Sequence, residues 1–221
     1  MNSAHRPLQV FVYQDVLCGW CYVADQRLDV LRRELGGTVK FIPRPYALRT
    51  AEGLPTAREV KVAITELQRA QKEAEGKRLS VELWQGTDLP RSSVATLAAL
   101  EAARVQGAEQ RQVFYKAMQH AALVEGINVT RADVLFELAE KLSLQMNRFA
   151  ATFNSQETRR LILEEHRIAT DRGVRGVPTL VIGGRWMVSG VREVSEYREH
   201  ILGCLGKRER ANFRTSESIL H

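Results

Sequence analysis

The chain has 221 residues, of which 44% are hydrophobic, and its 32 Lys and Arg outnumber 26 Asp and Glu to give a net charge of +6. This length suffices for one hydrophobic core with a subdomain, and the three cysteines are too few for a disulfide scaffold. The basic residues are spread along the chain without a dense block, and no apolar run approaches membrane-spanning length, so we expect neither nucleic acid nor a membrane among its partners.

The N-terminal residues 1–7 lack the apolar segment of a secretory signal. We therefore expect a cytoplasmic protein. In the cytosol a pair of closely spaced cysteines is more often catalytic than structural.

The first element is a strand over residues 8–13, where β-branched and aromatic residues alternate. A helix is predicted from Trp20 to Leu35, and residues 36–37, two glycines, would end it. Residues 38–46 are predicted to form a second strand, and their prolines suit the edge of a sheet. A strand, a helix and a strand of these lengths predict parallel pairing in a βαβ unit.

The sequence C-G-W-C at residues 18–21 lies where the first strand gives way to the helix. Cys18 would face the unpaired N–H groups and the positive end of the helix dipole, which favour a thiolate, the nucleophile of thiol–disulfide exchange. Cys21 follows at the spacing of a redox pair. Two alternatives are a zinc site completed by His200 and Cys204, and a pair of unconnected structural cysteines.

Residues 53–144 show only helical patterns, which predicts a helical subdomain within the α/β unit. A further helix is expected from Asn154 to about Gly173. Residues 179–182 and 186–188, joined through two glycines, predict a β-hairpin. A final helix is expected over residues 194–202, followed from Lys207 by a polar, basic tail.

The segment G-V-P-T at residues 176–179 precedes the hairpin, and proline is tolerated at the start of a strand. A cis Val177–Pro178 bond would leave the main chain of Val177 free to pair with an extended substrate. A trans proline in an ordinary turn is the alternative.

The order of these parts resembles the thioredoxin-fold DsbA family, and its FrnE-like branch in particular. The likeness lies in residues 14–22, Q-D-V-L-C-G-W-C-Y, and in G-V-P-T, placed on either side of a helical insertion. It implies an α/β thioredoxin-like fold with an inserted all-helical subdomain. The thioredoxin-like domain would comprise residues 1–52 and 154–206, the helical insertion residues 53–153, and the polar tail residues 207–221.

The resemblance also implies roles for the residues of both motifs. Cys18 would be the nucleophile and Cys21 the resolving cysteine, while the cis-proline loop of Val177 and Pro178 would bind substrate beside Gly19 and Trp20. Two departures stand out: Gly19 replaces a common proline, and Val12 occupies the position of the buried acid of thioredoxins. Asp15 is then the best local candidate for a proton relay, although satisfying backbone donors near the helix start is the more common task of an Asp there.

These features predict a thiol:disulfide oxidoreductase with a redox-active disulfide between Cys18 and Cys21 and no other cofactor, acting on protein or small-molecule thiols. Glutathione is a possible co-substrate, and a homodimer is one assembly open to the chain. Two alternative functions stay open. One is a glutathione-dependent isomerase or transferase, of the hydroxychromene-carboxylate isomerase type or the kappa-class glutathione transferase type, and the other is a non-enzymatic client-binding module.

Overall fold

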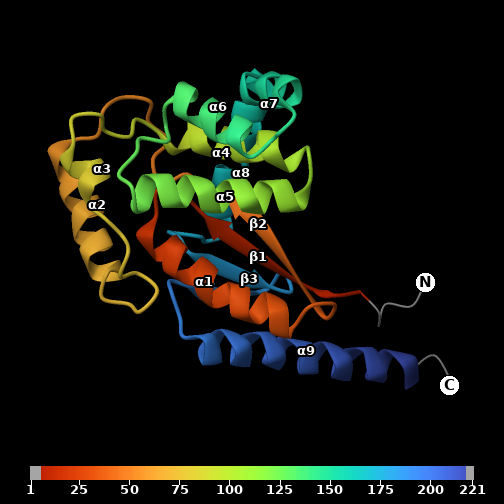
Figure 1. Cartoon of the computed structure of the whole chain (residues 1–221). Coiled ribbons are helices and arrows are strands. Elements are labelled where there is room, and N and C mark those ends of the chain that lie inside the picture. The colour runs from red at the N-terminus through yellow and green to blue at the C-terminus, as the bar shows by residue number, and fades with distance from the viewer. Residues whose placement is uncertain (1–5, 218–221) are drawn as a thin grey trace.

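The computed structural model describes the backbone of residues 6–217 and the side chains of residues 6–208. Within these residues the strands form one four-stranded sheet in the order β2-β1-β3-β4 (Figure 1). Its strands are Leu8–Gln14 (β1), Val39–Pro45 (β2), Thr179–Ile182 (β3) and Trp186–Ser189 (β4). β1 runs parallel to β2 and antiparallel to β3, and β3 pairs antiparallel with β4. The predicted parallel pair and the predicted hairpin are both confirmed.

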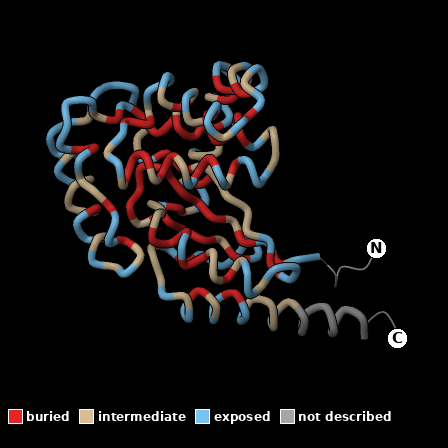
Figure 2. Tube along the Cα trace, in the orientation of Figure 1, coloured by how far each residue is buried: buried red, intermediate tan, exposed pale blue. Residues whose placement is uncertain are grey.

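The alternation of β1 divides its side chains between two faces of the sheet. Leu8, Val10 and Val12 share a buried cluster with residues of α1 (Gly19–Glu34) and α9 (Val194–Glu217). Phe11 and Tyr13 point to the other face, where they pack with residues at the end of α8 (Gln156–Asp171). The sheet is thus covered on both faces. Its central strands β1 and β3 are mostly buried, whereas the edge strands β2 and β4 are more exposed (Figure 2).

The remaining helices lie between β2 and α8 in the sequence. In the view of Figure 1 some of them lie above the sheet and the others at its left, beside α1. They are α2 (Ala57–Ala70), α3 (Glu82–Gln85), α4 (Ser93–Arg104), α5 (Ala108–Leu123), α6 (Ala132–Lys141) and α7 (Met146–Phe153). Phe114 and Phe149 meet edge to face in their core, with ring centroids 5.5 Å apart. Val16 and Leu17, just before the cysteine pair, are buried in the same core. The helical core therefore supports the loop that leads to Cys18.

The expected α/β thioredoxin-like fold is correct, but three helices differ from the sequence prediction. α3 and α7 were not predicted, because each is too short to show a clear helical period. The last helix was expected to end at residue 202, yet α9 continues to Glu217. The residues after Leu205 contain no proline, and single glycines within a helix cost only about 1 kcal/mol each, so nothing ends the helix at the predicted point. The polar tail predicted from Lys207 is therefore helical as far as Glu217.

Candidate functional site

Cys18 is the N-cap residue of α1. Its backbone is extended, with φ −93° and ψ 110°, and its Sγ atom accepts a hydrogen bond of 3.2 Å from the N–H of Cys21. A side chain at this position meets backbone donors that the helix leaves unpaired. The positive end of the α1 dipole therefore faces the Cys18 sulfur.

The segment before β3 approaches this sulfur from the opposite side. The Sγ atom of Cys18 lies 3.5 Å from the carbonyl oxygen of Val177, a contact that a thiol makes as a donor. The Val177–Pro178 peptide bond is cis, and Val177 lines the cavity beside Cys18. The structure therefore brings together the two motifs that the sequence separates by the whole helical subdomain.

Cys21 is the more deeply buried of the two cysteines, with 2% of its surface exposed against 6% for Cys18. Both are free thiols in this structure. Burial raises the pKa of the Cys21 thiol well above its ordinary value, and the hydrogen bond with Cys18 raises it further. Cys21 is therefore held as a thiol behind the sulfur that lines the cavity.

Asp15 is completely buried beneath the cysteine pair. One carboxylate oxygen accepts a hydrogen bond of 2.9 Å from the N–H of Leu17, and the other accepts one of 2.7 Å from the N–H of Leu48. Burial raises the pKa of the Asp15 carboxyl, and these hydrogen bonds act in the opposite direction. Asp15 thus ties the loop before Cys18 to the segment after β2; its role as a proton relay stays a prediction.

Gly19 and Trp20 both face α2. A Cβ atom at residue 19 would lie 2.7 Å from Cδ2 of Leu67, so any larger residue would force this buried side chain to shift. The indole N–H of Trp20 donates a hydrogen bond of 2.9 Å to Glu66. Gly19 therefore has a packing role against the helical subdomain, which the sequence did not reveal.

A cavity of about 440 Å³ opens beside Cys18, between the cysteine loop and α2. Trp20, Val62 and Leu67 supply apolar surface to its walls. Leu48 and Val62, at its edge, are 50% and 54% exposed. Large apolar side chains exposed around a groove mark a binding surface. The cavity joins this apolar surface to the Cys18 sulfur.

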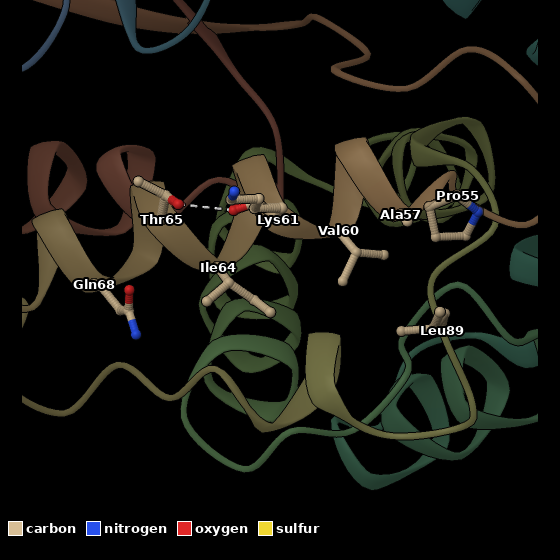
Figure 3. A pocket seen from close by; sticks show the side chains of 8 residues that line it. All are labelled: Pro55, Ala57, Val60, Lys61, Ile64, Thr65, Gln68 and Leu89. Carbon is tan, nitrogen blue, oxygen red and sulfur yellow. Dashed lines mark hydrogen bonds between the residues drawn. The ribbon is translucent and has the colours of Figure 1, made fainter.

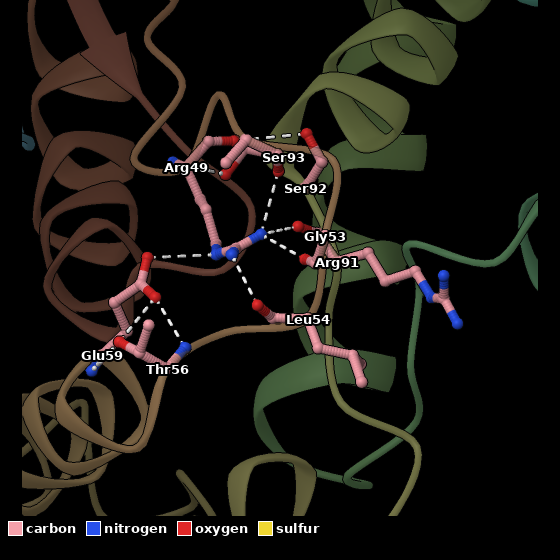
Figure 4. A network of polar contacts seen from close by, with 9 residues as sticks. Arg49, Gly53, Leu54, Thr56, Glu59, Arg91, Ser92 and Ser93 are labelled. Carbon is pink, nitrogen blue, oxygen red and sulfur yellow. Dashed lines mark hydrogen bonds and ion pairs between the residues drawn. The ribbon is translucent and has the colours of Figure 1, made fainter.

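The segment between β2 and α2 is held by Arg49, which the sequence did not single out (Figure 4). The guanidinium donates to four main-chain carbonyl oxygens, those of Ala51, Gly53, Leu54 and Arg91. It also pairs with Glu59 of α2 at 3.2 Å. Because no periodicity or motif predicts bonds from a side chain to loop carbonyls, this network could be found only in the structure.

A second groove, of about 620 Å³, runs along another side of α2 (Figure 3). Val60 and Ile64 of α2 and Leu89 of the loop before α4 form its apolar lining. No cysteine lines it. Of these two cavities, the smaller one therefore adjoins the cysteine pair.

Across the described part of the chain, no three His, Cys, Asp or Glu side chains are grouped to hold a metal ion. The zinc alternative therefore has no support there. None of the helices within residues 6–217 is both long and apolar enough to cross a membrane.

Residues 9–202 match the family model of the DSBA-like thioredoxin domain. Among solved structures, a Nitrosomonas europaea protein assigned as a disulfide isomerase superposes with a TM-score of 0.81 at 17% identity, covering 92% of this chain and 99% of that one. The cytosolic disulfide reductase DsbM from Pseudomonas aeruginosa, solved with GSH, gives a TM-score of 0.66 at 20% identity, over 97% of this chain and 100% of that one. At these identities the similarity shows a shared fold.

Among curated proteins, the chain is similar to the ClpXP adapter protein SpxH of Bacillus subtilis. The two are 28% identical over 176 residues, which are 79% of this chain and 58% of that protein. The chain therefore spans little more than half of that relative's length. The SpxH protein of Halalkalibacterium halodurans is 22% identical over 90% of this chain and 67% of its own.

Proposed function

We propose that this chain, which belongs to the DSBA-like thioredoxin domain family, is a thiol:disulfide oxidoreductase. It would exchange disulfides through Cys18 and Cys21. One observation carries the proposal. The Cys18 sulfur caps α1, faces the carbonyl of Val177 at 3.5 Å and lines an apolar cavity, with Cys21 directly behind it. A structural cysteine would need none of these surroundings.

The exchange proceeds in two steps. The Cys18 thiolate attacks one sulfur of a substrate disulfide, the S–S bond breaks, and the departing sulfur leaves as a thiolate that takes up a proton. Cys21 then loses its proton and attacks Cys18, which releases the second substrate sulfur as a thiol and leaves a Cys18–Cys21 disulfide. Two electrons and two protons have passed to the substrate. The reverse sequence oxidises a substrate dithiol.

The second step needs a group to accept the Cys21 proton, because burial holds that thiol neutral. We assign this task to Asp15. Burial raises the pKa of its carboxyl group, which makes its carboxylate a better proton acceptor. Its negative charge also opposes ionisation of Cys21, so the two groups compete for one proton. Proton transfer from Cys21 to Asp15 would relieve this repulsion.

The cavity favours an extended or small apolar substrate with a disulfide. The main chain of Val177 supplies pairing groups next to Cys18, and Trp20 adds apolar contact. In the cytosol, where we expect the protein, reduction or isomerisation of disulfides is the favoured direction. Glutathione is the proposed reductant that would regenerate the dithiol.

The experiment is turnover of an insulin disulfide with glutathione as electron donor, followed for the wild type and three single variants. Cys18→Ser should abolish turnover, and reduced Cys21→Ser, mixed with insulin in the absence of glutathione, should halt at a mixed disulfide that mass spectrometry detects. Cys204→Ser is the matched control, since Cys204 lies on α9 and lines neither of the two cavities described above. Undiminished turnover by Cys18→Ser would exclude the mechanism.

A client-binding adapter is the second candidate, favoured by the name of the curated relatives, ClpXP adapter proteins, and by the apolar rim of the groove. In that case the groove would bind a client protein and the cysteines would be dispensable. Client binding that is unchanged in Cys18→Ser and in both redox states, without insulin turnover in the wild type, would favour the adapter. Tight glutathione binding without redox turnover would instead favour the isomerase or transferase.

A further inference from the structure

Arg111, on α5, is a buried cation without an ion-pair partner among the described residues. Only 6% of the residue is exposed, and its Nη1 atom is shielded from solvent without a hydrogen-bond acceptor. The guanidinium lies over the ring of Tyr115, and its Cζ atom is 5.8 Å from the ring centroid. Among the side chains of residues 6–208, no carboxylate lies within ion-pair distance of it.

Such an arrangement is costly. A buried charge is normally paired and hydrogen-bonded, because removal from water must be offset by other contacts. Burial lowers the pKa of Arg111 to about 10, so the side chain still carries its positive charge at neutral pH. Asp25 and Glu101 attract this charge only from beyond ion-pair distance, so Arg111 has no directly paired carboxylate among the described side chains.

Arg111 lines a cavity of about 360 Å³ between β2, α4 and α8. This volume falls near the lower end of the range of roughly 300–1,000 Å³ found for small-molecule pockets. Its lining shares no residue with the cavity beside Cys18. Leu161, at 41% exposure, connects it to the surface.

The other charges in the cavity already neutralise one another. Glu101 pairs with Arg104 at 2.5 Å, and Arg44 pairs with Glu165 at 3.4 Å. Arg111 is left with one unit of positive charge. The remaining walls are aliphatic, supplied by Ile42, Pro43, Leu97, Leu100, Leu161 and Ile162.

We propose that this cavity binds a small organic monocarboxylate whose carboxylate pairs with Arg111 and whose aliphatic body lies between β2 and α8. A guanidinium matches a carboxylate in two parallel hydrogen bonds. A single negative charge balances the site, whereas a dianion would leave one charge uncompensated. The aliphatic walls favour an apolar body over a sugar or a phosphate ester.

The test is calorimetric titration of the whole chain with hexanoate, and with hexanol as the uncharged probe of the same length. Hexanoate should bind and hexanol should bind at least about tenfold more weakly, because a charged pair of hydrogen bonds is lost. Arg111→Met should abolish the preference for hexanoate. Arg160→Met, which removes an exposed arginine of α8 that does not line the cavity, should retain it.

The unfolding temperature gives a second test, which does not depend on the size of the titration signal. Without any carboxylate, Arg111→Met should unfold at a higher temperature than the wild type, because the unpaired charge is gone. Added hexanoate should raise the unfolding temperature of the wild type and leave that of Arg111→Met unchanged. Equal binding of hexanol and hexanoate, hexanoate binding by Arg111→Met, or no binding by the wild type would each overturn the site. A lower unfolding temperature for Arg111→Met alone would mean that internal water satisfies the arginine, which also overturns it.

Discussion

The Sγ atom of Cys18 lies 3.5 Å from the carbonyl oxygen of Val177, although 159 positions separate the two residues in the sequence. The sheet explains this proximity. β1 and β3 pair antiparallel, with Tyr13 opposite Thr179, so the end of β1 and the start of β3 lie at the same edge. Cys18 follows β1 and Val177 precedes β3. The site is therefore assembled by strand register, and the helical subdomain adds the wall across the cavity.

The two cysteines should differ in reactivity toward iodoacetamide. Cys18 lines the cavity, whereas Cys21 is 2% exposed and burial raises its thiol pKa well above the ordinary value. Because the thiolate is the reactive form, alkylation of the reduced protein at neutral pH should occur at Cys18 and spare Cys21. Fragment mass spectrometry of the shared peptide locates the label. Equal labelling of both sulfurs would contradict the buried position of Cys21.

Cys21 should also make the stability of the reduced protein depend on pH. Its folded-state pKa lies above its unfolded value, so the stability due to the neutral thiol is fully present below about pH 8.5 and is lost as the pH rises further. Urea unfolding under reducing conditions should therefore show a steeper alkaline loss for the wild type than for Cys21→Ala. The difference between the two curves removes the contribution of other groups. Parallel curves would show that Cys21 does not titrate differently on folding.

Gly19→Ala should destabilise the fold. The new Cβ would lie 2.7 Å from Cδ2 of the buried Leu67, and overpacking of this kind typically costs about 1–3 kcal/mol. Gly203→Ala is the control, since nothing lies within 4 Å of a Cβ there, and it should gain about 0.5–1 kcal/mol from helix propensity. Urea unfolding measures both.

A double variant identifies the cause of this loss. Leu67→Ala removes the group that the new methyl would meet, so Gly19→Ala should cost much less in its presence than alone. If the cost of Gly19→Ala is the same in both backgrounds, the contact with Leu67 is not its source.

The sequence predicted the features that have a period or a motif. The alternation in residues 8–13, the glycines before Thr38 and the C-G-W-C segment were sufficient for β1, α1 and the position of Cys18. It could not show the packing of Gly19 on Leu67 or the isolation of Arg111, because these depend on residues distant in the chain. α9 extends beyond its predicted end at residue 202, because no proline follows and each of its two glycines costs a helix only about 1 kcal/mol.

Arg49→Met should loosen the wall of the cavity while leaving the chemistry at Cys18 in place. The guanidinium holds four loop carbonyls and Glu59, and Leu48 and Arg49 themselves line the cavity. Its loss should cost about 1 kcal/mol in stability, because four loop carbonyls on exposed residues lose a charged donor and can turn to water instead. If the loop positions a polypeptide substrate, the KM for an unfolded protein should rise several-fold, with kcat and the turnover of a small disulfide little changed.

Arg91→Met is the matched control for this prediction. Only the carbonyl oxygen of Arg91 takes part in the network, while its side chain points away from Arg49 (Figure 4). The control should therefore match the wild type in stability and in KM, because the main chain that Arg49 holds is unchanged. Arg49→Lys should fall between them, since an ammonium donates from one point and cannot span carbonyls on two segments as a planar guanidinium does. If Arg49→Met lowers kcat for small and large disulfides alike, Arg49 supports the dithiol itself and not the wall of the substrate cavity.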